Sequence, residues 1–304
     1  MAAPIDFGAP AGVTASPLSD DFGVDVQGLD LARLGSHREE EQVRWIRRML
    51  RERLILRFRR QKLTQQQMVD FVGYFGPLAA VRTEGSTHDA IEGIKLITNE
   101  RDPSGKSKGD PPPYELTWHT DGSYMKAPTA YTALYCITAP KIDPTRTCWM
   151  SMQTAFARLP LARRRALAGI RVLHYSPKNP TRHAPEGAPM VGNCRATEQP
   201  LVRVIPDTGI PALFIGSIPD TPLVVEGERW SQERSKAFLD QLIAEGLQSG
   251  GCWETALQDD DLVFWDNRAM AHKRDNIGPD VDRVLWHVAV AGEVPVPLDL
   301  TAVA

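Results

Sequence analysis

The stretch Trp118-His119-Thr120-Asp121-Gly122-Ser123-Tyr124 places an imidazole and a carboxylate two positions apart. On an extended segment, residues i and i+2 point to the same side, so His119 and Asp121 should converge on one point. Two histidines and one carboxylate form the facial triad that binds non-haem Fe(II) and leaves coordination positions open. The stretch therefore supplies two of three such ligands, and the third must come from a distant part of the chain.

The third ligand is predicted late in the chain, beyond an apolar segment. Residues 261–268 indicate a buried strand that runs into a turn, and His272 follows it. Arg283 lies 11 positions after His272 and opens a second apolar strand, with turn-forming residues between them. We therefore expect His272 and Arg283 to face each other across neighbouring antiparallel strands. A metal beside a guanidinium suits a dicarboxylate co-substrate, because the metal chelates one end and the arginine binds the other carboxylate.

This ordered set of motifs resembles the taurine dioxygenase/TfdA-like Fe(II)- and 2-oxoglutarate-dependent dioxygenases. An HxD pair alone is a weak signal, but a distal histidine followed by an arginine at this spacing makes it specific. The resemblance runs from about Leu18 to Val294, nearly the whole chain. The residues that carry it are Trp118-His119-Thr120-Asp121, Phe264-Trp265-Asp266-Asn267-Arg268 with His272, Arg283, and Thr147 within Thr147-Cys148-Trp149.

The resemblance implies an iron site and a co-substrate site. His119, Asp121 and His272 would be the metal ligands and the catalytic residues. Arg283 and Thr147 would bind 2-oxoglutarate, whose 2-oxoacid end takes two open positions at Fe(II) while O2 takes the third. The implied reaction converts 2-oxoglutarate to succinate and CO2 and oxidises, most often hydroxylates, an unactivated C–H bond. Halogenating relatives replace the carboxylate ligand with a small residue, so the presence of Asp121 argues against halogenation.

The sequence says least about the primary substrate. The taurine enzymes have an arginine four positions after the 2-oxoglutarate arginine, where this chain has His287. We therefore do not expect a sulfonate substrate. A small organic substrate, either carboxylate-bearing or a natural product, is the working hypothesis, with Arg82 or His287 as the residue that contacts a carboxylate. Glu115, Tyr124 and Trp149 are further substrate candidates, although each also suits a packing or surface role.

Other activities stay open at this point. Desaturation or ring formation would use the same site. A Zn-dependent hydrolase could use the same three ligands, but it would leave Arg283 without a role. A non-catalytic jelly-roll binding protein could have kept the site by descent. The plain structural alternatives are a polar loop pair for His119 and Asp121, a surface cation for Arg283 and an ordinary strand residue for Thr147.

Composition excludes several classes of protein. The chain has 304 residues, 42% of them hydrophobic, and a net charge of −3, which argues against a nucleic-acid binder. Four widely spaced cysteines without a CxxC pair fit a reducing compartment. We find no signal peptide and no apolar run long enough for a membrane span. We therefore predict a cytoplasmic protein with a small-molecule substrate and no membrane or nucleic-acid partner; a homo-oligomer, either dimer or tetramer, is one open alternative.

The segment pattern predicts one domain, residues 1–304, that is mainly β with flanking helices. Many strands with a few helices indicate a two-sheet jelly roll, and the resemblance implies the cupin-like double-stranded β-helix. Residues 1–17 are expected to form a loose arm. Residues 99–116 and 175–200, rich in turn formers, are expected to be active-site loops. Helices are predicted at 38–53, at 64–74, at 151–168 with a break at Pro160, and at 231–247. The first should have an apolar stripe of Val43, Ile46, Met49 and Leu50, and the second should begin with a capping box at Thr64.

Overall fold

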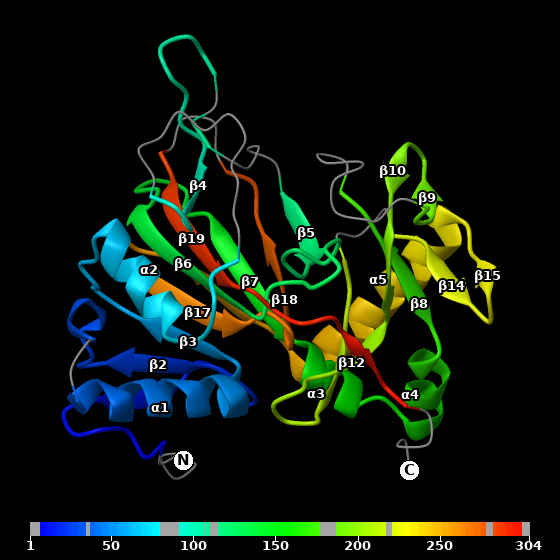
Figure 1. The fold of residues 1–304 in the computed structure, drawn as a ribbon, viewed down its shortest axis with the longest axis horizontal. Coiled ribbons are helices and arrows are strands. Elements are labelled where there is room, and N and C mark those ends of the chain that lie inside the picture. The colour runs from blue at the N-terminus through cyan, green and yellow to red at the C-terminus, as the bar shows by residue number, and fades with distance from the viewer. Residues whose placement is uncertain are drawn as a thin grey trace.

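The computed structural model describes residues 7–34, 37–79, 91–106, 108–109, 115–176, 187–216, 221–277 and 282–299, with the backbone alone for residues 37–40. These residues form five β-sheets, of which two face each other and carry the fold, with helices and three smaller sheets of short strands packed around them (Figure 1). Below, the four-stranded sheet is the one of these two that contains β5, β7, β16 and β18. The predicted class, mainly β with flanking helices, is confirmed. No described helix combines the length and the apolar character that a bilayer span requires.

Two sheets carry the fold, and the chain alternates between them. Strands β5, β7, β16 and β18 belong to one sheet, whereas β6, β17 and β19 belong to the other. The larger sheet has seven strands in the order β1 (Thr14–Pro17), β2 (Val24–Gln27), β3 (Ile55–Phe58), β17 (Leu262–Asp266), β6 (Tyr131–Thr138), β19 (Val284–Val290) and β4 (Lys95–Thr98). The smaller sheet has four strands in the order β16 (Trp253–Ala256), β7 (Arg146–Ser151), β18 (Met270–Arg274) and β5 (Leu116–His119).

The space between the sheets is filled by large apolar side chains. Trp149 of β7 stacks on Trp253 of β16, with ring centroids 5.2 Å apart. It also meets Trp265 of the facing sheet edge-on, at 5.8 Å. Strand β17 is buried on both faces, because Val263 and Trp265 join this inner core while its alternate residues join the outer one. Burial on both faces explains why the sequence of β17 is a continuous apolar run.

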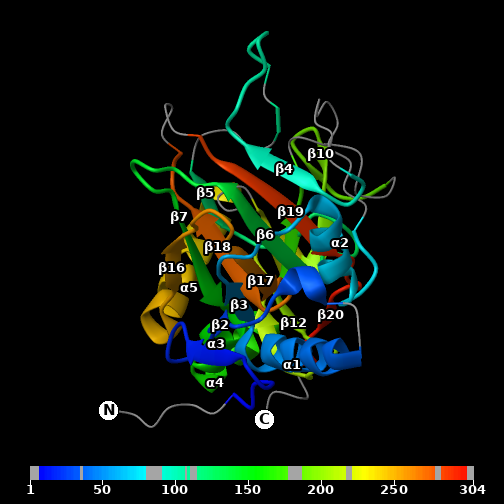
Figure 2. The same cartoon turned by 90° about the vertical axis from the view of Figure 1, so that its left-hand side faces the viewer.

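Helices α1 (His37–Arg53) and α2 (Gln65–Gly73) cover the outer face of the seven-stranded sheet (Figures 1 and 2). Ile46, Met49 and Leu50 of the apolar stripe predicted for α1 are buried there, and Val43 is half-buried. The capping box predicted at Thr64 is confirmed. The backbone N–H of Gln67 donates to Thr64 Oγ1 at 3.3 Å, and the N–H of Thr64 donates to Gln67 Oε1 at 2.8 Å. These bonds satisfy donors that a helix start otherwise leaves open.

A second group of elements lies beside the two sheets (Figure 1). The predicted helix at 231–247 is α5, and the predicted break at Pro160 separates α3 from α4. The hairpin β12–β13 is antiparallel. The elements are α3 (Met152–Ala157), α4 (Leu161–Ala168), α5 (Gln232–Gly250), β8 (Arg171–His174), β9 (Met190–Val191), β10 (Cys194–Arg195), β11 (Thr197–Pro200), β12 (Val202–Val204), β13 (Pro211–Leu213), β14 (Leu223–Val225), β15 (Glu228–Arg229) and β20 (Val296–Pro297); the short helix η1 (Leu31–Arg33) lies near α2.

The expectation of a loose N-terminal arm is wrong for residues 7–17. Phe7 and Val13 are buried, and the carbonyl of Phe7 accepts a hydrogen bond from Trp45 Nε1 at 3.0 Å. Strand β1 pairs with β2 at the edge of the larger sheet. A single aromatic anchor and an edge strand therefore fix a segment whose average composition suggested disorder. Residues 1–6 lie outside the described residues.

The two predicted loops differ from the expectation in part. Residues 175–200 contain β9, β10 and β11, so their last part is strand rather than loop. Residues 177–186 of this segment, and residues 107 and 110–114 of the 99–116 segment, lie outside the described residues. The role of either segment at the active site stays a prediction.

The expectation that His272 and Arg283 lie on neighbouring antiparallel strands is wrong. His272 lies in β18 of the four-stranded sheet, whereas Arg283 immediately precedes β19 of the seven-stranded sheet. The two residues therefore belong to opposite layers. Sequence spacing does not distinguish a hairpin from a crossing between layers, because both need a short connection with turn formers.

Candidate metal centre

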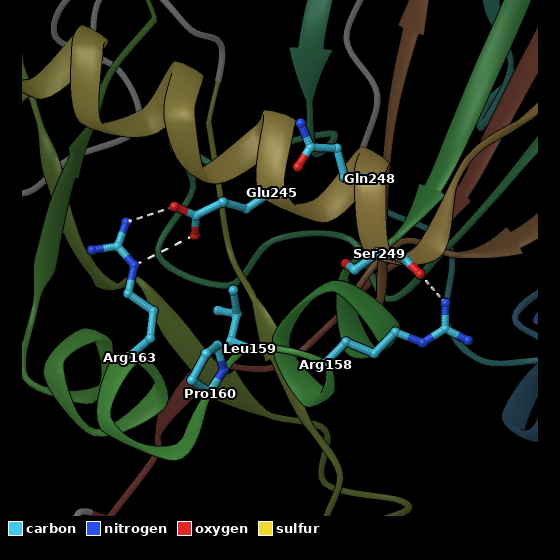
Figure 3. A pocket seen from close by; sticks show the side chains of 7 residues that line it. All are labelled: Arg158, Leu159, Pro160, Arg163, Glu245, Gln248 and Ser249. Atoms are coloured by element: carbon cyan, nitrogen blue, oxygen red, sulfur yellow. Dashed lines mark hydrogen bonds and ion pairs between the residues drawn. The ribbon is translucent and has the colours of Figure 1, made fainter.

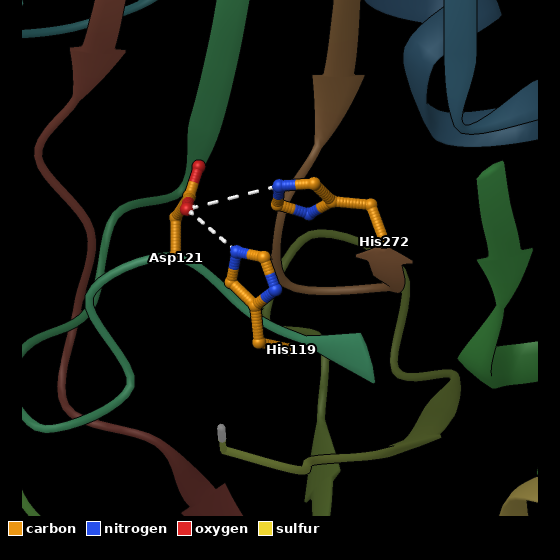
Figure 4. A group of neighbouring side chains, drawn as sticks. All are labelled: His119, Asp121 and His272. Atoms are coloured by element: carbon orange, nitrogen blue, oxygen red, sulfur yellow. Dashed lines mark ion pairs between the residues drawn. The ribbon is translucent and has the colours of Figure 1, made fainter. Parts of the chain in front are cut away.

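His119 and His272 meet through direct strand pairing. They are Cα partners across β5 and β18, and their ring centroids lie 4.2 Å apart. Asp121 lies just beyond the end of β5, in a turn rather than on the strand. Its Oδ1 is 3.6 Å from His119 Nε2 and 3.9 Å from His272 Nε2 (Figure 4). One ligand atom from each residue lies within 4.8 Å of the others, which is a spacing that one metal ion can bridge.

The two imidazoles are oriented by contacts behind the cluster. His119 Nδ1 donates to the carbonyl of Thr117 at 2.7 Å, which leaves the lone pair of Nε2 directed at the cluster. His272 packs against Trp149 and Trp265, with ring centroids at 6.3 Å and 5.1 Å. Burial, and then the neighbouring His119, lower the pKa of His272 to about 3. His272 is therefore neutral at physiological pH, which is the form that binds a metal.

The turn that carries Asp121 is fixed from the facing sheet. The N–H of Asp121 donates to Asn267 Oδ1 at 3.1 Å, and Asn267 Nδ2 donates to the carbonyl of Asp121 at 3.0 Å. Gly122 has a φ of 65°, and a Cβ at this position would lie 2.7 Å from the side chain of Met125. Glycine thus permits the left-handed turn, and Asn267 holds it.

An ion pair supports the segment that contains Asn267. Buried Arg268 pairs with Asp266 at 2.8 Å, and although burial opposes it, this carboxylate raises the pKa of Arg268. The buried guanidinium of Arg203 donates hydrogen bonds to the carbonyls of Arg268 and Asn267, at 2.8 Å and 2.9 Å. These contacts hold Asn267, and through it the Asp121 turn, in one position.

We expect Asn267→Ala to lower the free energy of unfolding by about 2–4 kcal/mol, because it leaves several buried backbone groups without partners. Urea denaturation of the metal-free protein measures this loss. Asn276→Ala is the matched control, since Asn276 is exposed, and it should change stability by less than about 0.5 kcal/mol. Equal stabilities for the two variants would show that the hydrogen bonds of Asn267 do not matter to the fold.

The second oxygen of Asp121 contacts His287. His287 Nε2 lies 3.2 Å from Asp121 Oδ2, while Oδ1 faces the two other histidines. Burial by itself would raise the pKa of Asp121, but His272 and the hydrogen bond from His287 outweigh burial and lower it. Asp121 is thus ionised. His287, predicted as a substrate residue, contacts the carboxylate of Asp121, and its role towards substrate stays a prediction.

Arg283 is a buried cation whose charge interacts with Arg274, which lies two positions after His272 on β18. Its side chain is buried, and its Nη1 has no hydrogen-bond partner. Thr147 of β7 is also buried and lies directly opposite Arg274 of β18. Burial, and then the guanidinium of Arg274, lower the pKa of Arg283 to about 10. Among the described residues no carboxylate forms an ion pair with Arg283, so its positive charge lacks a protein counter-charge.

The remaining substrate candidates are spread over several environments. Trp149 is fully buried and packs between Trp253, Trp265 and His272, and its contact with substrate stays a prediction. Tyr124 is half-buried in the turn after Asp121, and its carbonyl accepts from Thr197 Oγ1 at 2.7 Å. Glu115 is exposed just before β5. Arg82 lies outside the described residues.

Sequence reasoning missed Arg274 and the contact made by His287. Arg274 lies two positions after His272 on the same strand, and both are buried whereas Lys273 between them is not. The period-two rule for strands could have assigned Arg274 to the face of the metal ligand. No such signal existed for His287, because its partner Asp121 comes from a remote turn.

A separate pocket lies on the surface between α5 and the segment that joins α3 to α4 (Figure 3). Its volume is about 480 Å³. Arg163 pairs with Glu245 at 3.4 Å, and Arg158 donates to the carbonyl of Ser249. The pocket contains no residue of the metal cluster and is lined by paired surface charges, so it is not the catalytic site.

Comparison with known proteins agrees with this geometry. Residues 14–289 match the family model "Taurine catabolism dioxygenase TauD, TfdA family". The chain is 27% identical to the (S)-phenoxypropionate/alpha-ketoglutarate-dioxygenase of Sphingobium herbicidovorans, over 95% of this chain and 97% of that one. It is 26% identical to the alpha-ketoglutarate-dependent 2,4-dichlorophenoxyacetate dioxygenase of Cupriavidus pinatubonensis, over 86% of this chain and 91% of that one.

Comparison of the fold with solved structures identifies the same family. A crystal structure of a taurine dioxygenase from Burkholderia xenovorans superposes with a TM-score of 0.74 and 26% identity, covering 94% of this chain and 91% of that one. The resemblance expected from the motifs is thereby confirmed across nearly the whole chain. The chain belongs to the TauD/TfdA family of dioxygenases, enzymes that use Fe(II), 2-oxoglutarate and O2.

Proposed function

We propose that this enzyme couples the decarboxylation of 2-oxoglutarate to the hydroxylation of an unactivated C–H bond in a small organic substrate. One observation carries the proposal: three metal-ligand side chains converge, and a buried guanidinium without a counter-charge lies in the same core. A hydrolytic zinc site would need the three ligands but would give Arg283 no role. The combination favours an enzyme that binds both a metal and an anionic co-substrate.

The metal site fits Fe(II) by its donor set. His119 and His272 offer neutral nitrogen atoms, and Asp121 offers one negative charge that offsets part of the charge of the ion. Fe(II) bound by these residues supplies the activation of O2. The protein contributes ligands whose orientation is set by Thr117, Asn267 and the indoles around His272. These contacts keep the three ligands together before the metal binds.

Arg283 supports the assignment of 2-oxoglutarate to the same core. A buried cation without a counter-charge is costly, and a ligand carboxylate would remove that cost. With a pKa of about 10, Arg283 carries its charge at physiological pH. Arg274 adds positive charge at the same end, and Thr147 lies opposite it on β7. We assign the distal carboxylate of 2-oxoglutarate to Arg283 and a supporting contact to Thr147.

We propose a small carboxylate-bearing molecule as the primary substrate. Two relatives are named for phenoxypropionate and 2,4-dichlorophenoxyacetate, and both compounds carry a carboxylate. Tyr124, in the turn after Asp121, is the described candidate nearest in sequence to the ligands. Arg82 stays the candidate for the carboxylate contact, because His287 is already engaged with Asp121. Hydroxylation is the simplest outcome; desaturation or ring closure would appear as different products in the same assay.

Two further assignments support the proposal. We assign the facing sheets to the double-stranded β-helix of cupin-like jelly rolls, because the chain alternates between the two sheets from β5 to β7 and again from β16 to β19. We also assign the protein to the cytoplasm, since all four cysteines are free thiols, as expected in a reducing compartment.

An anaerobic titration followed by a turnover screen tests the function. Fe(II) and 2-oxoglutarate together should give the wild-type protein a visible charge-transfer band, and aryloxyalkanoic acids should stimulate succinate release. Taurine and an alkyl sulfate serve as comparison substrates. Zn(II)-supported hydrolysis without 2-oxoglutarate would overturn the proposal, as would the absence of both the band and succinate release.

A further inference from the structure

We propose that His287 is a positioning residue of the metal centre, which holds Oδ2 of Asp121 away from the metal so that this carboxylate binds through Oδ1 alone. The inference rests on the proposed function, because it concerns the same metal site. Among the described residues, His287 pairs with the carboxylate of Asp121 and with no other carboxylate. It acts on the reaction through Asp121.

The two oxygens of Asp121 have separate partners. Oδ1 lies 3.6 Å from His119 Nε2 and 3.9 Å from His272 Nε2, the atoms expected to share the metal. Oδ2 lies 3.2 Å from His287 Nε2. His119 and His272 come from the four-stranded sheet, whereas His287 comes from β19 of the seven-stranded sheet. The carboxylate is therefore held from one layer of the fold while it faces ligands of the other.

The geometry fixes the tautomer of His287. A carboxylate can only accept a hydrogen bond, so Nε2 of His287 carries the proton in its contact with Asp121. Nδ1 of His287 is buried and has no hydrogen-bond partner. A second N–H at that atom would be a buried donor without an acceptor, which is costly. His287 thus presents one donor to Oδ2 and no lone pair to the metal, so it is not a fourth ligand.

A hydrogen bond from His287 to Oδ2 keeps open the metal coordination positions that the reaction needs. A facial triad leaves three positions open, and a carboxylate that bound through both oxygens would take one of them. Asn267 already fixes the backbone of Asp121, but it does not contact the carboxylate. His287 supplies the contact that sets the rotation of the carboxylate group. Outer partners of this kind typically contribute about 10- to 100-fold to metal affinity or activity.

The test compares His287→Ala with His287→Gln. Glutamine can place an amide N–H near the position of the imidazole Nε2, whereas alanine leaves Oδ2 free. We expect His287→Ala to weaken Co(II) binding by about 10- to 100-fold and to change the Co(II) absorption spectrum towards a higher coordination number. His287→Gln should restore most of the affinity and the wild-type spectrum. Lys273→Ala, beside His272 but facing away from the cluster, should change neither.

Two results would overturn the inference. One is a His287→Ala protein whose Co(II) affinity lies within about twofold of wild type and whose spectrum is unchanged. The other is a His287→Gln protein that behaves like the alanine variant, because the hydrogen bond would then not be the cause. Thermal unfolding of the metal-free variants separates a loss of fold from a loss of positioning. A wild-type protein that bound Co(II) but never consumed 2-oxoglutarate would overturn the proposed function and leave this comparison valid.

Discussion

His272→Ala is expected to abolish 2-oxoglutarate turnover and to raise the dissociation constant for Fe(II) by on the order of 1,000-fold, more than the loss of an outer partner costs. His272 is one of three candidate ligands, and no other described imidazole can replace it, since His287 Nε2 is engaged with Asp121. Anaerobic Fe(II) titration measures the effect. The visible band formed with 2-oxoglutarate should be absent from the variant.

A buried histidine outside the cluster provides the control for His272→Ala. His174 of β8 is also buried and stacks on Phe214, with ring centroids 4.8 Å apart. His174→Ala should destabilise the fold, as removal of any large buried ring does, but should keep the Fe(II) affinity within about threefold of wild type. If His272→Ala bound Fe(II) as tightly as His174→Ala, His272 would not be a ligand and the metal centre would have to be reassigned.

Arg283→Gln is expected to raise the dissociation constant for 2-oxoglutarate by about 150- to 5,000-fold, which corresponds to the 3–5 kcal/mol typical of breaking a buried ion pair. The variant removes the charge and the two-pronged donor geometry while keeping a side chain of similar length. Fe(II) affinity should stay near the wild-type value, since Arg283 touches no metal ligand in the described contacts. Titration of the Fe(II)-loaded protein with 2-oxoglutarate, without oxygen, measures this dissociation constant.

Comparison of 2-oxoglutarate with a second 2-oxoacid tests whether Arg283 binds the distal carboxylate. Pyruvate has the 2-oxoacid end but lacks the distal carboxylate, so it should bind the wild-type protein much more weakly than 2-oxoglutarate does. Arg283→Gln should nearly remove this preference, and Arg283→Lys should keep part of it because the charge remains. A glutamine variant that still preferred 2-oxoglutarate by the wild-type factor would assign the distal carboxylate to another group, with Arg274 as the first candidate.

The candidate ligand set could be identified from the sequence because it depends on residue type and order. His119, Asp121, His272 and Arg283 carry recognisable chemistry, and their order along the chain matches one family. Local helix-start signals were equally informative, because the capping box at Thr64 begins a helix in the structure as in the prediction. Signals of this kind act within a few residues, so packing elsewhere does not reverse them.

The errors concern contacts that cross between layers. Arg283 was expected beside His272 in one sheet, but the chain changes sheet between them. His287 was considered a substrate residue because it takes the place of an arginine in the taurine enzymes, and neither its contact with Asp121 nor the packing of Trp149 could be predicted from sequence position. A strand pattern tells which residues share a face, yet it does not tell what lies opposite that face. Trp149 meets two other indoles, and His287 meets a carboxylate from a distant turn.

The direct pairing of His119 with His272 bears on how enzymes of this architecture can diversify. Backbone hydrogen bonds between β5 and β18 set the separation of the two imidazoles, whatever the length of chain between them. Asp121 is tied to Asn267, which comes 146 positions later, so the third ligand is anchored at the same junction. Insertions or exchanges in the intervening hairpins and helices would reshape the entrance for substrate and leave the iron chemistry intact. Evolution can therefore vary what is oxidised without having to rebuild how oxygen is used.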